Sequence, residues 1–290
     1  MTSPTLNVLG AGRVGRTLAR LWHQTGLLRL QGVACRTVAS AQQACEFIGA
    51  GAPRTPPQLP AADVWMLAVP DASIAEVAQT LAALAPSPDT TPVVFHCAGA
   101  SGSELLQPLA DRGWRTASAH CILSFARAEV ALAQFPGTVC ALEGDAAARA
   151  LLHQAFTAIG AQCFTVRTQD KLLYHAAAVF ATNFLPVLQS VAEGAWAASG
   201  VPPELLPHLR ATLLRNAVDN ITALGPAGAL TGPAARGDTA HIARQSTVVR
   251  QWQPAAGTAY DALSALALQL AHQRPTDHAL PPPEAALKST

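Results

Sequence analysis

Residues 5–15 read Thr-Leu-Asn-Val-Leu-Gly-Ala-Gly-Arg-Val-Gly, a short apolar run that ends in the pattern Gly10-x-Gly12-x-x-Gly15. A segment with helical periodicity follows at 16–24, so the glycines stand between a predicted strand and a predicted helix. Gly10 suits a tight turn, Gly12 lets a phosphate approach bare backbone, and Gly15 lets the helix pack closely on the strand. The free N–H groups that begin the helix can then receive phosphates. This context favours a dinucleotide site over a glycine turn without a ligand, with contacts from Gly10, Ala11, Gly12, Arg13, Val14 and Gly15.

Outward from that stretch, strand and helix patterns alternate through the first half of the chain. Continuous apolar strands separated by helices are typical of a parallel sheet that is covered on both faces. Strands are predicted over 6–9, 30–35, 63–69, 93–97, 115–119, 138–142 and 162–166, helices over 12–24, 39–48, 74–84 and 146–159, and a Pro-rich loop over 53–60. We therefore expect an α/β fold with an N-terminal Rossmann-type, mostly parallel sheet.

The second half has a different character, with helical patterns and no convincing strand. Helices are predicted over 170–199, with a bend at Pro186, and over 204–223, 239–252 and 257–273. The segment 171–198 is apolar on most faces, so we expect it to be buried among neighbouring helices. The expected domains are a nucleotide-binding domain over 1–167, an all-α domain for substrate binding and dimer formation over 168–274, and a loose tail over 275–290.

The composition excludes several classes of function. The 290 residues are 50% hydrophobic and 13% charged with a net charge of +1, which predicts no nucleic-acid partner and no anionic membrane partner. No uninterrupted apolar stretch reaches the ~18 residues of a membrane span. The six cysteines form no C-x-x-C pair, which predicts no metal site and reduced thiols. Because Met1 to Pro4 run straight into the first strand without room for a signal peptide, we expect a cytoplasmic protein.

The residue after the second strand predicts which dinucleotide binds. An NAD site usually has an acidic residue about 20 positions beyond the glycines, where it binds the ribose 2′-OH. Arg36 stands there instead, 36 − 15 = 21 residues beyond Gly15, and Thr37 follows it. Arginine matches a 2′-phosphate in charge and geometry, which favours NADP(H) over NAD(H). The alternative is an ordinary solvated arginine at a strand end.

Two further strand ends are expected at the same crevice, because open α/β sheets bind ligands outside the carboxyl ends of their strands. They would line the ribose and the nicotinamide with backbone and small side chains. The alternative for each is an ordinary turn from strand to helix. The residues are Val69, Pro70 and Asp71 at one strand end and Cys97, Ala98 and Gly99 at the other.

Candidate chemistry lies in the helix that opens the second half. Lys171 and His175 are four residues apart on one helical face, with Tyr174 nearby and Asn183 two turns further on. A lysine ammonium beside a nicotinamide could polarise a carbonyl and donate a proton as hydride arrives. The alternative is a lysine in the first helical turn whose charged end reaches water.

Other polar residues are candidates for substrate contacts. His120 and Ser124 follow a predicted strand at the rim of the crevice, although a histidine held by backbone groups fits equally well. The segment 230–238, Leu-Thr-Gly-Pro-Ala-Ala-Arg-Gly-Asp, presents Arg236 and Asp238 between two helices. Arg236 offers a fork for a carboxylate, whereas Asp238 could simply cap the following helix.

With these residues assembled, the chain resembles the Rossmann-like NADP oxidoreductases that carry a C-terminal helical domain of unknown function. The resemblance is carried by the 230–238 loop, Lys171-x-x-x-His175 and His96-Cys97-Ala98-Gly99-Ala100. The chain is more distantly similar to ketopantoate reductases, pyrroline-5-carboxylate reductases and β-hydroxyacid dehydrogenases. That similarity implies that Lys171 matches a catalytic lysine and that His175 replaces an asparagine. It also implies that His120-Cys121 stands where relatives have His-Pro, and that the helical domain forms a homodimer.

The sequence thus predicts an NADPH-dependent oxidoreductase that reduces the carbonyl of a small, acidic metabolite. Lys171 would be the general acid, His175 would orient it or share the proton, and the substrate would be positioned by His120, Ser124, Asn183, Arg236 and Asp238. One alternative is a cyclic imine reductase of the pyrroline-5-carboxylate type. The other is an NADP-binding sensor or assembly subunit without turnover.

Overall fold

The computed structural model of the chain describes residues 3–84 and 91–273. The chain divides into two compact units, Met1–Ala181 and Thr182–Thr290. The division falls later than the expected boundary at 167/168 because the helix α7 (Lys171–Ala178) begins with a side chain buried in the first unit. The expected loose tail over 275–290 lies outside the described residues.

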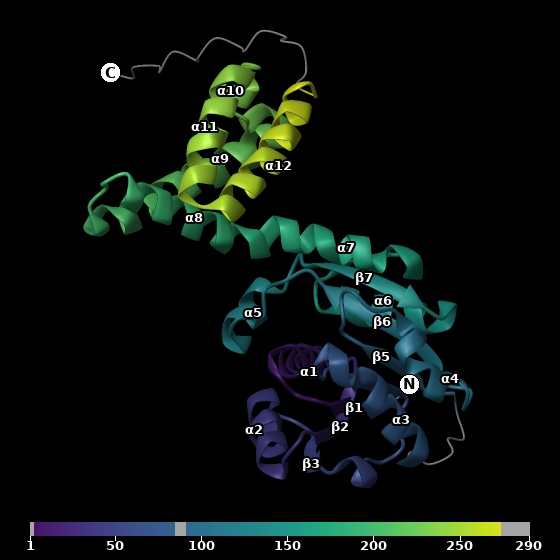
Figure 1. Ribbon diagram of the computed structural model, residues 1–290. Helices are drawn as coiled ribbons and strands as arrows, with labels where there is room; N and C mark the ends of the chain where they lie inside the picture. The colour runs from purple at the N-terminus through teal and green to yellow at the C-terminus, as the bar shows by residue number, and fades with distance from the viewer. Residues whose placement is uncertain (1–2, 85–90, 274–290) are drawn as a thin grey trace, which may run out of the picture. The chain divides into compact units, whose positions relative to one another are not determined.

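The first unit is built on one sheet of eight strands in the order β3-β2-β1-β4-β5-β6-β7-β8 (Figure 1). Neighbouring strands are parallel except for β6 and β7, which are antiparallel, so the predicted α/β fold with a mostly parallel sheet is confirmed. The strands are β1 (Thr5–Leu9), β2 (Arg29–Ala34), β3 (Ala52–Arg54), β4 (Val64–Leu67), β5 (Val93–His96), β6 (Arg115–Cys121), β7 (Val139–Gly144) and β8 (Gln162–Thr165).

Two features of the sheet differ from expectation. The strand β3 lies where a loop was expected at 53–60, and it contains Pro53 because an edge strand tolerates the missing N–H group. The last two strands run opposite to the rest of the sheet. Apolar periodicity could not predict this reversal, because it reports which residues are buried and says nothing about strand direction.

Helices cover both faces of this sheet, which is why a strand such as β4 is buried along its whole length. The helices α1, α2, α5 and α6 pack on one face and α3 and α4 on the other. On the first face Trp22 of α1 contacts Phe156 of α6 with ring centroids 5.1 Å apart, and its indole N–H donates to the Ala155 carbonyl. The helices are α1 (Arg13–Thr25), α2 (Val38–Ile48), α3 (Ile74–Leu84), α4 (Gln107–Ala110), α5 (Ala128–Gln134) and α6 (Ala146–Ala158).

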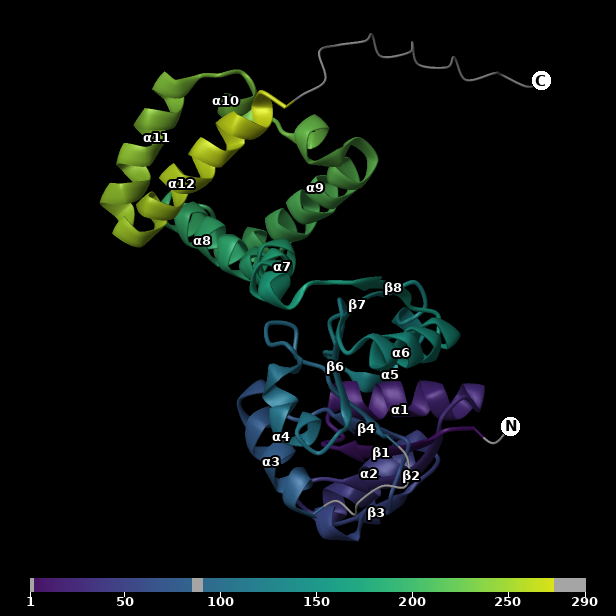
Figure 2. The same cartoon turned by 90° about the vertical axis from the view of Figure 1, so that its right-hand side faces the viewer.

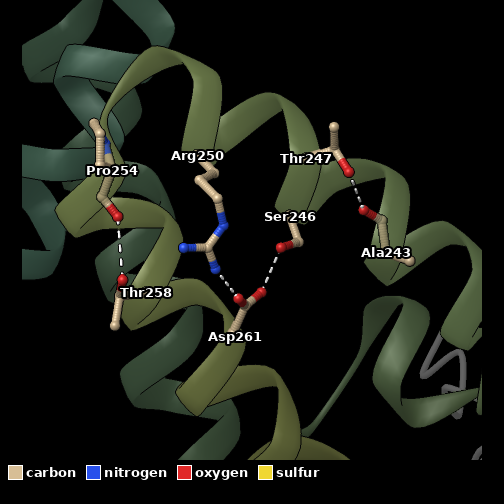
Figure 3. Close-up of polar contacts among 7 residues, drawn as sticks. All are labelled: Ala243, Ser246, Thr247, Arg250, Pro254, Thr258 and Asp261. Carbon is tan, nitrogen blue, oxygen red and sulfur yellow. Dashed lines mark hydrogen bonds and ion pairs between the residues drawn. The ribbon is translucent and has the colours of Figure 1, made fainter.

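The second unit is helical throughout its described residues. Its elements are α8 (Phe184–Ala198), α9 (Leu206–Ala229), α10 (Gly232–Ala235), α11 (Thr239–Trp252) and α12 (Pro254–Ala271). The helix α9 is interrupted at Gly225, whose φ of +68° is not helical. Figures 1 and 2 both show α11 and α12 side by side. In Figure 3, Asp261 of α12 accepts hydrogen bonds from Arg250 and Ser246 of α11.

The predicted helix over 170–199 is divided, but not in the way we expected. A π-helical turn, Val179–Asn183, separates α7 from α8. The helix is therefore irregular just before Pro186, where we had expected a bend at the proline itself. The carbonyl group that Pro186 would crowd lies in this π-helical turn. A proline lacks an N–H group and clashes with the carbonyl four residues earlier, and a wider turn relieves that clash.

The expected burial of this segment is wrong for the single chain. Leu172 and Leu173 are 70% and 76% exposed, and no residue in the most apolar window of 168–198 is buried to the full extent. By length and composition alone, this segment of 31 residues could cross a membrane, a criterion that core helices of soluble proteins also meet. Its first turn is nevertheless tied into the first unit, because Lys171 has no exposed surface.

Candidate active site

The carboxyl ends of β2, β1, β4 and β5 form one row across the sheet, and Ser118 in the middle of β6 continues this row. Paired residues along this row are Ala34, Leu9, Leu67, His96 and Ser118. The segments that follow the first four of these residues therefore leave the sheet at the same edge. They include the predicted cofactor contacts at 10–15, 36–37, 69–71 and 97–99. His120 stays within the sheet, two residues beyond Ser118 in β6, where it pairs with Ala141.

The glycine turn has the geometry that a dinucleotide requires. A Cβ atom on Gly10, whose φ is +81°, would lie 2.7 Å from the Ala68 carbonyl oxygen, and one on Gly15 would lie 2.5 Å from the Gly10 oxygen. A Cβ atom on Gly12 would meet nothing within 4 Å, so the backbone there faces open space. Ala11 lies in the turn, while Arg13 and Val14 begin α1.

The start of α1 is free to receive an anion. Gly12 caps the helix without a side-chain hydrogen bond, and its first turn contains no acidic residue. Its N–H groups and the positive end of the helix dipole can thus face a phosphate. The residues present fit a bound dinucleotide at this position.

Arg36 and Thr37 lie directly between β2 and α2. Arg36 is exposed, and Thr37 caps α2 by accepting a hydrogen bond from the Ser40 backbone N–H. The Thr37 hydroxyl also shares a hydrogen bond of 2.8 Å with the Ser40 hydroxyl. An exposed guanidinium beside a helix N-terminus fits a phosphate group.

The loop after β4 closes over the glycine turn. A Cβ atom on Gly10 would lie 2.6 Å from Cγ1 of Val69, so Val69 packs directly against Gly10. Pro70 and the exposed Asp71 follow, and Asp71 begins a 3-10 turn, Asp71–Ser73, before α3. The structure thus brings the end of β4 to the glycine turn.

The loop after β5 is held by a buried histidine that we had not assigned to the site. Nδ1 of His96 accepts from the Ala98 N–H, which leaves Nε2 to donate to the Gly102 carbonyl at 2.8 Å. Burial lowers the pKa of His96, so the ring is neutral at pH 7. The ring therefore fixes the loop at Ala98 and at Gly102, with Cys97 directly before the first of these contacts and Gly99 directly after it.

The candidate catalytic side chains meet at Gly99. A Cβ atom there would lie 2.4 Å from Cδ2 of His175 and 2.8 Å from Nε2 of His120. Nδ1 of His120 shares a hydrogen bond of 2.9 Å with the Tyr174 hydroxyl. Burial, then His175 and Lys171, lower the pKa of His120 to about 4, whereas burial raises the pKa of Tyr174. His120 is therefore a neutral ring whose second nitrogen faces the loop after β5.

Lys171, the first residue of α7, is fully buried. Its ammonium donates to Ser118 Oγ at 2.8 Å and to the Ala98 carbonyl at 3.3 Å. The alternative in which its charged end reaches water is excluded, because the side chain has no exposed surface. Lys171 thus places a positive charge directly under the Ala98–Gly99 loop.

Glu143 of β7, which we had not predicted as a site residue, completes this network. The register pairs it with Ser118 across the antiparallel β6–β7 ladder. Its carboxylate accepts hydrogen bonds from Ser118, Ser103 and Thr168, including the Ser103 backbone N–H. Burial opposes its ionisation, yet these hydrogen bonds outweigh burial and lower its pKa. The sequence pattern that could have indicated Glu143 is an acidic residue near the end of the otherwise apolar strand 139–144.

The remaining predicted substrate contacts lie in other parts of the chain. Ser124 is exposed in the loop after β6. Asn183, Arg236 and Asp238 belong to the second unit. Asp238 caps α11 by accepting from the His241 N–H at 3.0 Å, as the structural alternative predicted. Among the residues that the structure describes, no cluster of His, Cys, Asp and Glu could hold a metal ion.

Two known domain families match separate parts of the chain. Residues 3–121 match a Rossmann-like domain, and residues 138–267 match a domain of unknown function, DUF2520. No curated protein matches the sequence. The two matches correspond to the predicted combination of a nucleotide-binding sheet and a helical domain of unknown function.

Solved structures share this fold over most of their length. Protein TM1727 of Thermotoga maritima is 26% identical with a TM-score of 0.73, and the match covers 92% of this chain and 98% of that one. A Bacteroides fragilis protein provisionally assigned as an NADP oxidoreductase is 20% identical, with a TM-score of 0.68 and coverage of 92% and 99%. A pyrroline-5-carboxylate reductase from Coxiella burnetii is 18% identical, with a TM-score of 0.57 and coverage of 93% and 99%.

Proposed function

Since the chain combines a Rossmann-like domain with a DUF2520 domain, we propose that it is an oxidoreductase that uses NADPH to reduce a carbonyl or imine carbon of a small metabolite. The observation that carries this proposal is the contact at Gly99. His120 and His175 lie directly on the loop that follows the fifth strand, at the same sheet edge as the open glycine turn. Ionisable side chains thus lie beside a loop that a nicotinamide would contact in this fold.

NADPH is the proposed cofactor. The turn around Gly12 would hold its pyrophosphate, and Arg36 with Thr37 would hold its 2′-phosphate. Bound there, the nicotinamide supplies a hydride. The role of the protein is then to position the substrate and to provide charge and a proton at the atom that becomes reduced.

We assign the positive charge to Lys171 and the proton exchange to the imidazoles. Lys171 was expected to be a general acid, but its ammonium is buried and bonded to Ser118 and Ala98. Its charge can stabilise negative charge that develops near the loop, as a fixed cation does in a site with little water. His175 and His120 are only partly buried and both lie against Gly99, so they could relay a proton to the substrate.

The substrate is proposed to be a small 2-oxo acid such as ketopantoate. The acidic group is inferred from Arg236 in the second unit, whose guanidinium could pair with a carboxylate. Steady loss of NADPH absorbance with a panel of 2-oxo acids would support this function. Absence of turnover with every member of the panel would contradict it.

Imine reduction is the second candidate. It is favoured by the fold similarity to a pyrroline-5-carboxylate reductase, which covers 93% of this chain and 99% of that one. The same assay with pyrroline-5-carboxylate separates the two candidates. If the protein binds NADPH tightly but turns over neither class of substrate, a role as a cofactor-binding sensor replaces both.

A further inference from the structure

The sequence contains two lysines, Lys171 and Lys288, among nineteen lysines and arginines in all. Lysine is thus rare in this chain, since the other 19 − 2 = 17 of these residues are arginines. An ammonium is compact and donates in three directions, whereas a guanidinium is a wide planar fork. Position 171 is fully buried, where a compact cation fits and a fork would need more room.

We propose that Glu143, acting through the hydroxyl of Ser118, is a positioning residue that holds the Lys171 ammonium beneath the carbonyl of Ala98. This inference rests on the proposed function, in which the Ala98–Gly99 loop contacts the nicotinamide. Glu143 itself touches neither Lys171 nor that loop by any described hydrogen bond. Its effect on the reaction is therefore transmitted through Ser118.

The hydrogen bonds of Ser118 make this arrangement directional. Ser118 Oγ accepts from Lys171 Nζ at 2.8 Å and donates its only proton to Glu143 Oε2 at 2.8 Å. A hydroxyl that already donates to a carboxylate must present a lone pair to its other partner. Ser118 is therefore held as an acceptor, and the ammonium is drawn to one position.

Glu143 is itself fixed on its other sides. Ser103, from the turn after β5, and Thr168, from the turn before α7, donate to the same carboxylate. The network thus ties together β6, β7, the loop after β5 and the start of α7. The series of hydrogen bonds from Glu143 through Ser118 to Lys171 ends at the Ala98 carbonyl, which accepts from the Lys171 ammonium.

Charge balance also favours this role. Burial lowers the pKa of Lys171, and Glu143 is the carboxylate that opposes this most strongly. Glu143 and Ser118 are buried as well, so water does not screen them as it screens surface pairs. The titratable groups that act on Lys171 or feel its charge are Asp71, His96, Glu104, His120, Cys140 and Glu143.

The small number of lysines allows a direct test. With Lys288→Arg as the background, lysine labelled with ¹³C at Cε gives a signal from Lys171 alone, in the full-length protein without cofactor. We expect Lys171 to titrate at lower pH in Glu143→Gln and in Ser118→Ala than in the background protein. Glu129→Gln is the matched control, because it removes the same charge from an exposed side chain of α5.

Kinetics then test positioning. We expect kcat of Glu143→Gln to fall roughly 10- to 100-fold, with a smaller change in the KM for NADPH. Equal Lys171 titration in Glu143→Gln, Ser118→Ala and Glu129→Gln would overturn the proposal, as would unchanged kcat in both network variants. If Glu143→Gln fails to fold, Ser118→Ala decides alone, because it keeps the carboxylate and removes only the bridge.

The two proposals fail in different ways. If the unmodified protein neither binds nor oxidises NADPH, the proposed function fails and so does the positioning role. The titration would still show whether Glu143 controls the charge of Lys171. If turnover occurs but Lys171 titrates identically in all variants, only the positioning role fails.

Discussion

At the scale of single residues, the candidate site contains two cations in different surroundings. Arg36 is exposed at the end of β2, whereas Lys171 is buried under the loop after β5. Both are cations, yet one suits a phosphate that arrives from solvent and the other suits charge that develops within the protein. This difference in burial leads to two separate predictions.

Arg36→Ala should weaken NADPH binding about 10- to 100-fold, because a charge-assisted contact to phosphate contributes roughly 1.5–3 kcal/mol. NADH binding should change little, since NADH lacks the 2′-phosphate. Fluorescence titration with both cofactors measures this. Arg29→Ala is the control, because Arg29 lies at the amino end of the same strand. Equal losses for NADPH and NADH would contradict the assignment.

Lys171→Met should lower kcat/KM by about 10²- to 10³-fold, the typical effect of removing a group that stabilises transition-state charge. Methionine fills a similar volume, so we expect the variant to bind NADPH still. Retained NADPH binding would show that the variant is folded. Lys288→Met is the matched control because it removes the other lysine of the sequence. Full activity in Lys171→Met would remove this residue from the proposed chemistry.

At the scale of elements, the three glycines of the turn between β1 and α1 have different structural roles. A side chain on Gly10 would be strained by its φ of +81° and would strike Ala68, whereas a side chain on Gly12 would enter open space. Gly12 has an extended backbone that other residues can adopt. Folding should therefore depend on Gly10, and ligand binding on Gly12.

Gly12→Val should leave the melting temperature close to that of the unmodified protein and abolish detectable NADPH binding, because the valine occupies the space over the helix start. Gly10→Val should destabilise the fold by roughly 2 kcal/mol or more, through backbone strain and overpacking. Thermal melts with and without NADPH measure both effects. A strong loss of stability in Gly12→Val would show that this space is not open.

At the scale of the whole molecule, buried ionisable groups make stability depend on pH. Burial lowers the pKa of His96 and, together with nearby His175 and Lys171, lowers that of His120 to about 4; hydrogen bonds lower that of Glu143 despite its burial. Each group binds protons more readily when the chain is unfolded. Their contribution is present near pH 7 and is lost as pH falls through the interval between the unfolded and folded pKa values.

The melting temperature should therefore fall between pH 7 and pH 5, where unfolded histidines gain protons that folded His120 and His96 do not. His120→Gln should reduce this dependence, because glutamine does not titrate. Melting curves at several pH values for both proteins provide the measurement. An equally steep decline in His120→Gln would show that other groups control acid stability.

The exposed apolar side chains of the helical unit suggest assembly. Val218, Ile221 and Leu224 are spaced three residues apart on α9 and are 56%, 49% and 59% exposed. Residues at this spacing share one face of a helix, and such exposed apolar faces mark interaction surfaces. We propose that a second copy of the chain covers this face.

Ile221→Asp should convert a dimer into a monomer at micromolar concentrations, because burying a carboxylate in an apolar interface is unfavourable. Light scattering coupled to gel filtration measures the mass. Asn220→Asp is the control, as it adds the same charge at the neighbouring position. A monomeric unmodified protein, or a dimer that survives Ile221→Asp, would place the contact elsewhere or exclude it.

Local sequence determined the first unit in most respects. The glycine turn, the buried strands and the helices α2 and α3 follow from turn chemistry, apolar runs and helical periodicity, which are properties of neighbouring residues. For the same reason the candidate residues Gly12, Arg36 and Lys171 could be named in advance. Their types and positions relative to strand ends already restrict what they can do.

The tertiary structure alone decided which groups face Lys171 and which way β7 and β8 run. Ser118 lies 53 residues from Lys171, and Glu143 lies 25 residues from Ser118. No local pattern connects them, because they meet only when β7 pairs antiparallel with β6. Burial and pairing across such distances depend on the whole packed sheet. The sequence by itself therefore determined that a cation stands at position 171, and the fold decided that it is buried and held through Ser118.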